Sequence, residues 1–273
     1  MRSPAARWIV AVVITLASLV WQRMSGPTYP ARGSVSVGGP RIAMRLERSH
    51  TIASDQPVVV HAADAAITGE VVWRRFPTEE PWEITDLVRE GDELRAALPR
   101  QPAAGKLEYQ VRLRRGDEQA IFPVRPAVTR FRGDVPAWVL IPHIAAMFLG
   151  LLFAARGGIE ALADGTPRGC ARAALASFVV GGFMLGPAVQ KFAFGEWWAG
   201  VPYGWDLTDN KTLLAVLAWI VAVWALRGGR RARAVVLAAA VVTLLVFAVP
   251  HSAWGSQIDW AKVKQATSDA LHK

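Results

Sequence analysis

Four apolar runs in the second half of the chain restrict its possible folds more than any other feature. They lie at about 136–155, 171–190, 212–226 and 233–249. An α-helix needs about 20 apolar residues to cross ~30 Å of hydrocarbon, so the third run is short unless its helix starts by Asp209. Because 52% of the 273 residues are hydrophobic and are concentrated in such runs, the sequence predicts a membrane bundle rather than one large soluble core.

A fifth apolar run lies near the N-terminus. Residues 8–21, "WIVAVVITLASLVW", follow Arg2 and Arg7. The next residues, "QRMSGP", contain no small-residue cleavage site of the A-x-A type. We therefore expect residues 1–29 to form a retained signal anchor and linker, which gives about five transmembrane helices in all.

Residues 30–134 have the pattern of a β domain. Short segments rich in β-branched or alternating residues are separated by turn formers such as "SDQP" and "REGD". Six of these segments are "RIAMRLE", "PVVVHA", "EVVWRRF", "ELRAAL", "LEYQVRLR" and "QAIFPV". Strands at roughly ten-residue spacing indicate an all-β sandwich of immunoglobulin or fibronectin type. We expect Trp73 and Tyr109 in its core or on a sheet face.

The distribution of charge predicts the orientation of the chain. The net charge is +9, yet residues 30–134 carry almost equal numbers of basic and acidic groups. Arginines instead gather in the loops at 156–172 and 227–233, which then face the cytoplasm by the positive-inside rule. The N-terminus is accordingly expected in the cytoplasm and the sandwich outside.

The same topology assigns the remaining segments. Residues 135–250 form a four-helix transmembrane bundle with an outer Trp-rich loop at 191–211. Residues 251–273 form an extracytoplasmic tail. The Arg- and Ala-rich composition and the single cysteine favour a bacterial inner membrane, with membrane lipid as a direct partner.

Several classes of function are disfavoured by what the sequence lacks. No cluster of Lys and Arg is interleaved with aromatic residues on the soluble part, so we expect no nucleic-acid partner. Cys170 is the only cysteine, which excludes an intrachain disulfide and covalent c-type haem attachment. The nucleophile elbow, the phosphate-binding loop and HExxH are also missing, so no catalytic residue is assigned.

The outer loop contains the most unusual segment, "FGEWWAGVPYGWDLTDNKTLL" at 194–214. The topology places it at one level of the membrane with His143 and His251. Trp and Tyr gather at membrane interfaces for amphipathic reasons alone, and Thr208 or Asp209 is expected to cap the following helix. Ionisable residues inside a span nevertheless indicate a functional site by default.

This segment resembles the tryptophan-rich, WWD-type segment of the haem-handling membrane proteins of cytochrome c assembly. The similar positions are Gly195, Trp197, Trp198, Trp205 and Asp206. In that family the segment faces outward between two histidines of neighbouring spans, which correspond here to His143 and His251. Phe194 replaces the family's first Trp, and residues 201–204 interrupt the motif.

The resemblance implies a haem b site. Two neutral imidazoles suit the iron, and Trp faces suit a porphyrin. His143 and His251 are then the axial ligands, with Met147 as an alternative sixth ligand. Lys191 and Lys211, at the two ends of the loop, pair with the propionates.

Two other hypotheses remain open at this stage. The first is a divalent-metal site in the same place, formed by His143, His251, Asp206 and Asp209 with help from Glu196. The second is a non-catalytic subunit of an envelope complex, in which the sandwich binds an extracytoplasmic protein. It is supported by the small-xxx-small spacing of Gly182 and Gly186, which permits close helix packing. Under the second hypothesis no cofactor is bound.

Overall fold

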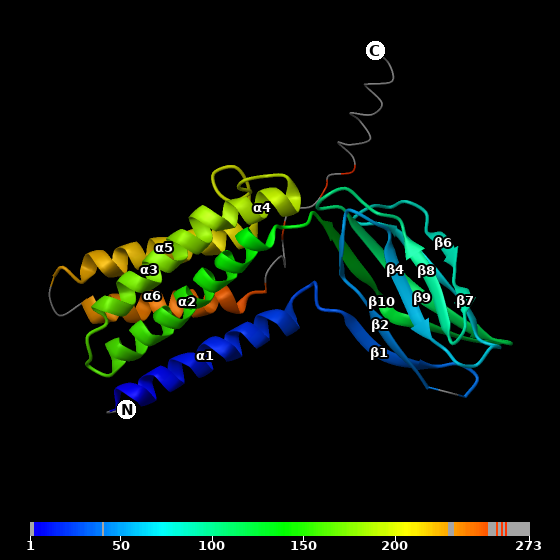
Figure 1. The fold of residues 1–273 in the computed structure, drawn as a ribbon, viewed down its shortest axis with the longest axis horizontal. Coiled ribbons are helices and arrows are strands. Elements are labelled where there is room, and N and C mark those ends of the chain that lie inside the picture. The colour runs from blue at the N-terminus through cyan, green and yellow to red at the C-terminus, as the bar shows by residue number, and fades with distance from the viewer. Residues whose placement is uncertain are drawn as a thin grey trace, which may run out of the picture. The chain divides into compact units, whose positions relative to one another are not determined.

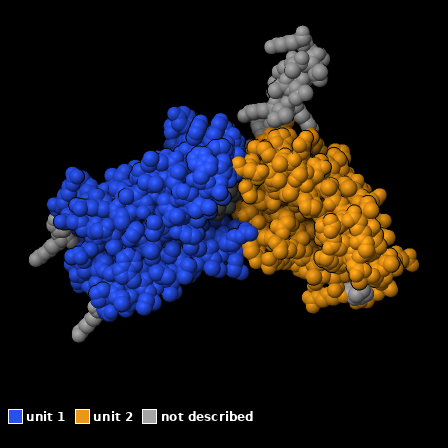
Figure 2. Space-filling view, viewed as in Figure 1, with its two compact units in different colours: residues 1–26, 135–256 blue, residues 27–134, 257–273 orange. Residues whose placement is uncertain are grey.

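The computed structural model describes residues 3–39, 41–228, 232–250, 255, 258 and 260. It divides into two compact units (Figure 2). The helical unit comprises residues 1–26 and 135–256, and the β unit comprises residues 27–134 and 257–273. His251, a candidate ligand, lies outside the described residues.

The helical unit contains seven helical elements in its described residues (Figure 1). They are α1 (Pro4–Ser25), α2 (Ala137–Leu162), α3 (Arg168–Phe178), the π-helix η1 (Val179–Leu185), α4 (Gly186–Phe194), α5 (Leu207–Ala225) and α6 (Ala232–Ala248). The elements α3, η1 and α4 follow one another without a break. All the predicted apolar runs are helical, and α5 starts before Asp209, as a span of sufficient length requires.

Four helical segments in the described part of the chain are long and apolar enough to cross a membrane. They are α1, α2, the continuous segment Arg168–Phe194 and α5. The remaining apolar helix, α6, has 17 residues, at the short end of the range for a span.

Helix α1 is bound to the bundle at both of its ends. Near its C-terminus, Trp21 Nε1 donates to the Ala248 carbonyl at 2.8 Å and Gln22 Nε2 donates to the Phe247 carbonyl at 2.7 Å. Near its N-terminus, Arg7 Nη1 lies 2.6 Å from Glu160 Oε2. Glu160 Oε1 also lies 2.5 Å from Arg156 Nη2, so one buried carboxylate of α2 joins two arginines.

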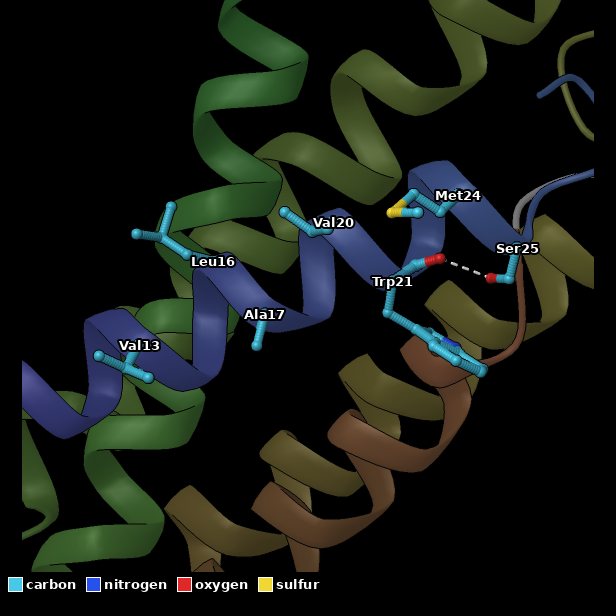
Figure 3. Close-up of a pocket in the computed structure, with 7 residues that line it drawn as sticks. All are labelled: Val13, Leu16, Ala17, Val20, Trp21, Met24 and Ser25. Carbon is cyan, nitrogen blue, oxygen red and sulfur yellow. Dashed lines mark hydrogen bonds between the residues drawn. The ribbon is translucent and has the colours of Figure 1, made fainter. Parts of the chain in front are cut away.

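Between these attachments the outer side of α1 is apolar. A shallow hollow there is lined only by residues of α1, namely Val13, Leu16, Ala17, Val20, Trp21, Met24 and Ser25. Figure 3 shows these side chains and the hydrogen bond of 2.6 Å from Ser25 Oγ to the Trp21 carbonyl.

The β unit contains ten strands in its described residues. They are β1 (Ala31–Ser36), β2 (Arg41–Leu46), β3 (Ser49–Thr51), β4 (Gln56–His61), β5 (Thr68–Arg75), β6 (Glu83–Asp86), β7 (Val88–Glu90), β8 (Glu93–Leu98), β9 (Lys106–Arg115) and β10 (Glu118–Arg132). They form sheets of order β1-β2, β3-β10-β9-β5-β6 and β4-β8-β7. All pairs are antiparallel except β3 with β10.

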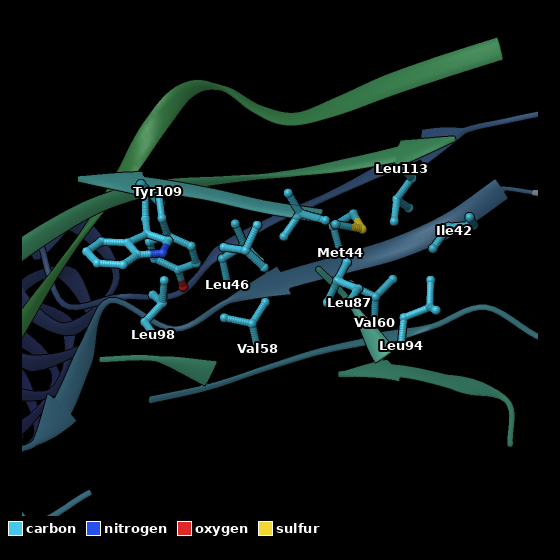
Figure 4. Packing of buried hydrophobic residues seen from close by; sticks show 14 of the residues in the cluster. Ile42, Met44, Leu46, Val58, Val60, Leu87, Leu94, Leu98, Tyr109 and Leu113 are labelled. Carbon is cyan, nitrogen blue, oxygen red and sulfur yellow. The ribbon is translucent and has the colours of Figure 1, made fainter. Parts of the chain in front are cut away.

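One hydrophobic core joins the strands of these sheets (Figure 4). Alternate residues of β2, β4 and β8 face it, as the burial pattern of β2 shows with Ile42, Met44 and Leu46 buried. Trp73 and Tyr109 are both buried in this core, which confirms the prediction made for them.

A polar network lies inside that core. Tyr109 Oη donates to the Glu47 carbonyl at 2.6 Å and accepts from Gln56 Nε2 at 3.2 Å. Thr129 Oγ1 donates to Gln56 Oε1 at 2.6 Å. Burial raises the pKa of Tyr109 above its ordinary value, because the phenolate is poorly solvated there.

Candidate functional site

The Trp-rich loop is shorter than predicted. Helix α4 continues to Phe194 and α5 begins at Leu207, so the loop comprises residues 195–206 instead of 191–211. Gly195 ends α4 in the left-handed conformation with φ of 87°, which glycine adopts without steric cost. Lys191 Nζ donates to the Gly195 carbonyl at 2.7 Å, and the side chain of Lys191 remains exposed.

Polar residues at the start of α5 fold this loop back onto the helix. Asp206 is the N-cap, because its Oδ1 accepts from the backbone N–H of Thr208 at 2.8 Å and of Asp209 at 3.4 Å. The prediction that Thr208 or Asp209 is the cap was therefore wrong by two or three residues. Asp209 Oδ2 instead accepts from Ala199 N at 2.7 Å, and Asn210 Oδ1 accepts from Val201 N at 2.8 Å.

Lys211 continues this series of contacts but points into the bundle. The residue is only 4% exposed, and its Nζ donates to the carbonyls of Val249 at 2.7 Å and Pro250 at 3.3 Å. These carbonyls follow α6, where an ammonium group also complements the helix dipole. Lys211 thus holds the end of α6 and does not lie at the rim of the loop, where the propionate hypothesis expects it.

The three tryptophans of the loop differ in their surroundings. Trp198 is half-buried: its ring lies 5.4 Å from that of Phe183, and its Nε1 donates to the Val201 carbonyl at 3.1 Å. Trp197 and Trp205 are 61% and 86% exposed. Trp198 therefore supports the loop, and the other two leave open aromatic faces.

His143 lies in α2 and is half-buried against the π-helix. Its Nδ1 is 2.8 Å from the Gly181 carbonyl. A carbonyl only accepts, so Nδ1 carries the proton and Nε2 keeps its lone pair. Within the described residues, Nε2 has no hydrogen-bond partner. The same carbonyl accepts from the backbone N–H of Gly186, five residues later, as expected in a π-helix.

Small residues permit the close approach of η1 to its neighbours. A Cβ added to Gly181 would lie 2.9 Å from Met147 Sδ, and one added to Gly182 would lie 2.2 Å from Thr212 Cγ2. The predicted small-residue pair thus has one member, Gly182, in tight packing within the chain. Gly186 is less crowded, since an added Cβ would lie 3.4 Å from the Gly181 carbonyl oxygen and 3.9 Å from His143 Cε1. Met147 packs against these glycines.

The described acidic residues do not form a metal centre with neighbouring His, Cys, Asp or Glu side chains of the described ranges. In the part of the chain that the structure describes, no group of three or more His, Cys, Asp or Glu residues is placed to hold a metal ion. Asp206 Oδ1 and Asp209 Oδ2 each accept hydrogen bonds from backbone N–H groups.

Two residues near this site were not singled out from the sequence. Asn210 belongs to the loop contacts, and nothing in its sequence position distinguishes it from a surface residue. Gln190 has a buried Nε2 atom without a hydrogen-bond partner. A polar residue inside the run 171–190 is itself a signal, because polar side chains are rare within spans. Comparison of the chain with protein-family models and with curated proteins finds no match.

Proposed function

We propose that this chain is a multi-pass protein of a bacterial inner membrane that handles haem b at the outer end of its helical bundle. In this proposal α6 is the fifth span. The N-terminus is cytoplasmic, and the β unit is an extracytoplasmic sandwich of immunoglobulin or fibronectin type.

The contacts between helix ends support this orientation. The hydrogen bonds of Trp21 and Lys211 place the end of α1, the start of α5 and the end of α6 together at one end of the bundle. The Trp-rich loop is at that end. The opposite end carries Arg7, Arg156, Arg168 and Arg233, as the positive-inside rule requires of a cytoplasmic side.

The state of His143 is the observation that carries the haem proposal. A histidine that ligates a metal donates its other ring N–H to a carbonyl or carboxylate, which fixes the tautomer and orients the ring. The bond from Nδ1 to the Gly181 carbonyl has this form and leaves Nε2 as the ligating atom. His251 directly follows Pro250, whose carbonyl accepts from Lys211, and we assign it as the second ligand.

The loop supplies the remaining contacts. Trp197 and Trp205 offer exposed ring faces to a porphyrin, and Trp198 holds the loop against η1. Lys191 is exposed and uses one N–H on the Gly195 carbonyl, which leaves two donors for a propionate. Haem held by two imidazoles supplies reversible one-electron chemistry, and the protein sets its potential.

Visible absorption of the full-length protein, purified in mild detergent after haem is supplied during expression, tests this proposal. We expect a Soret band and, after dithionite reduction, sharp α and β bands. Both His143→Ala and His251→Ala should abolish this spectrum, whereas His61→Ala, at an exposed position of the β unit, should preserve it. A colourless wild-type protein, or a spectrum unchanged in His143→Ala, would refute the proposal.

A further inference from the structure

Gln190 is a polar residue of a membrane-spanning segment, and its amide nitrogen has no hydrogen-bond partner among the described residues. Its Nε2 atom is buried and makes no hydrogen bond within the described residues. Buried amide donors in folded proteins are almost always paired, so such an atom calls for a physical explanation. Neither the loop contacts nor the packing of α4 uses it.

The position of Gln190 relates it to His143. Gln190 follows Gly186 by four residues in α4, so both lie on one face of that helix. Helical side chains lean toward the N-terminus of their helix, which directs Gln190 over Gly186, where no side chain is present. A Cβ at Gly186 would lie 3.4 Å from the Gly181 carbonyl oxygen and 3.9 Å from His143 Cε1, the ring atom between Nδ1 and Nε2.

The neighbouring aromatic pair fixes the level of Gln190 in the bundle. Phe192 of α4 packs edge-on against Trp138 of α2, with ring centroids 6.4 Å apart. Trp138 precedes His143 in α2, and Phe192 follows Gln190 in α4. Because these two helices contact each other and run in opposite directions, Gln190 lies between the level of His143 and the outer aromatic pair.

The two side chains offer complementary chemistry. His143 Nε2 presents a lone pair, and Gln190 Nε2 presents N–H donors. A haem fits this combination, since it carries a metal ion and, at its edge, carboxylate oxygens that accept hydrogen bonds. Lys211 is engaged with the end of α6 and does not serve this carboxylate.

We propose that Gln190 is a further ligand-binding residue, which donates a hydrogen bond to one propionate carboxylate of the haem that His143 ligates. This inference rests on the proposed function. A hydrogen bond to a charged group stabilises by about 1.5–3 kcal/mol, or roughly 10- to 150-fold in affinity. Lys191 remains available to the second propionate at the loop.

Haem and haem dimethyl ester, whose propionates are methylated, are the probes for a binding titration followed at the Soret band. The full-length protein in detergent should bind haem at least about tenfold more tightly than the ester. Gln190→Leu should weaken haem binding by about that factor and leave ester binding unchanged. Gln190→Glu should weaken haem binding further, because the new carboxylate then faces the carboxylate of the propionate and repels it. Gln22→Leu, which removes a partnered glutamine of α1, is the matched control and should retain the preference for haem.

The outcomes separate the two proposals. If the wild type binds haem through His143 but Gln190→Leu keeps the full preference over the ester, only the role of Gln190 is wrong. If the wild type shows no preference, the role of Gln190 is likewise wrong, and this result depends on no variant that has to fold. If neither compound binds the wild type, both the haem site and the role of Gln190 are overturned.

Discussion

The two units of this protein use buried polar side chains for different purposes. In the β unit, Tyr109, Gln56 and Thr129 bond to one another and to the Glu47 carbonyl inside a core whose backbone is largely paired in sheets. In the helical unit, Asp206, Asp209 and Asn210 bind backbone N–H groups at the start of α5 and in the adjoining loop, and Lys211 binds backbone carbonyls after α6.

The difference follows from where each backbone is left unpaired. A sheet pairs its interior strands along their whole length, so its core polar groups are free to bond among themselves. A helix leaves four N–H and four carbonyl groups unpaired at its ends, and these groups need other partners. Asp206 and Lys211 of "DLTDNK" meet this need, and Asp209 and Asn210 bind N–H groups of the adjoining loop. These contacts account for most of the polarity of a segment that otherwise has the composition of a ligand site.

Removal of the Asp209 carboxylate should have the largest effect on stability. In Asp209→Ala the backbone N–H groups that it binds lose a charged acceptor in a buried place, and we expect the free energy of unfolding to fall by about 3 kcal/mol. Chemical unfolding in mild detergent, followed by tryptophan fluorescence, measures this change. Glu196→Ala, an exposed acid of the same loop, is the control and should change it little. Equal losses in both variants would contradict the assigned role.

The corresponding change in the β unit should have a smaller effect. Tyr109→Phe keeps the ring in the core but removes the hydroxyl that joins Glu47 to Gln56, and we expect a loss of about 2 kcal/mol. The side chain of Gln56 retains the Glu47 carbonyl and Thr129 as partners, which limits the cost. Urea unfolding monitored by near-ultraviolet circular dichroism tests this expectation. A loss larger than that of Asp209→Ala would reverse the comparison.

The N-cap of α5 should contribute less to the free energy of unfolding than either Asp209 or Tyr109. Asp206→Ala removes the side chain that caps α5, and we expect the free energy of unfolding to fall by about 1 kcal/mol. Asp206→Ser supplies another good capping oxygen and should restore most of it. Thermal unfolding of both variants in detergent measures this difference. If Asp206→Ser is no more stable than Asp206→Ala, the capping role is wrong.

The last prediction concerns the pH dependence of stability, and it expects no change in the free energy of unfolding at neutral pH. The pKa of Tyr109 is raised by burial, so the folded state favours the neutral phenol. Its contribution to stability is complete below the unfolded pKa of about 10 and is lost as the pH rises above it. Unfolding of the β unit should therefore become easier above pH about 10, and Tyr109→Phe should show a smaller dependence over that range. Identical slopes for the two proteins would exclude this titration as a cause.

Local sequence pattern was enough to predict most elements. The predicted segment at 93–98 coincides with β8, and the apolar run at 233–249 differs from α6 by one residue at each end. The strand pattern also placed Trp73 and Tyr109 in the core or on a sheet face, and both are buried in the core. Strands β1, β3, β6 and β7 were missed, since their burial patterns show little of the alternation that identifies β2.

The roles of site residues depended on contacts that sequence spacing does not reveal. The path of the loop back to α5 brings the N–H of Ala199 to the carboxylate of Asp209. Sequence spacing alone does not distinguish this role from that of a metal ligand. The π-helix presents the Gly181 carbonyl to His143, and no residue pattern marks its extra residue per turn. Gln190 carries a sequence signal as a polar residue inside an apolar run, but only the structure shows that its Nε2 atom is buried without a hydrogen-bond partner in the described residues.

The attachment of α1 has a consequence for the order in which this protein assembles. The chain is synthesised from its N-terminus, yet Trp21 and Gln22 bond to carbonyls at the end of α6, the last helix described. Helix α1 is therefore synthesised before α6, and its C-terminal end is secured only once α6 has formed. Arg7 meets its partner Glu160 earlier, once α2 has formed. The attachment of α1 to α6 is thus a late event, because it joins two helices that lie far apart in the sequence.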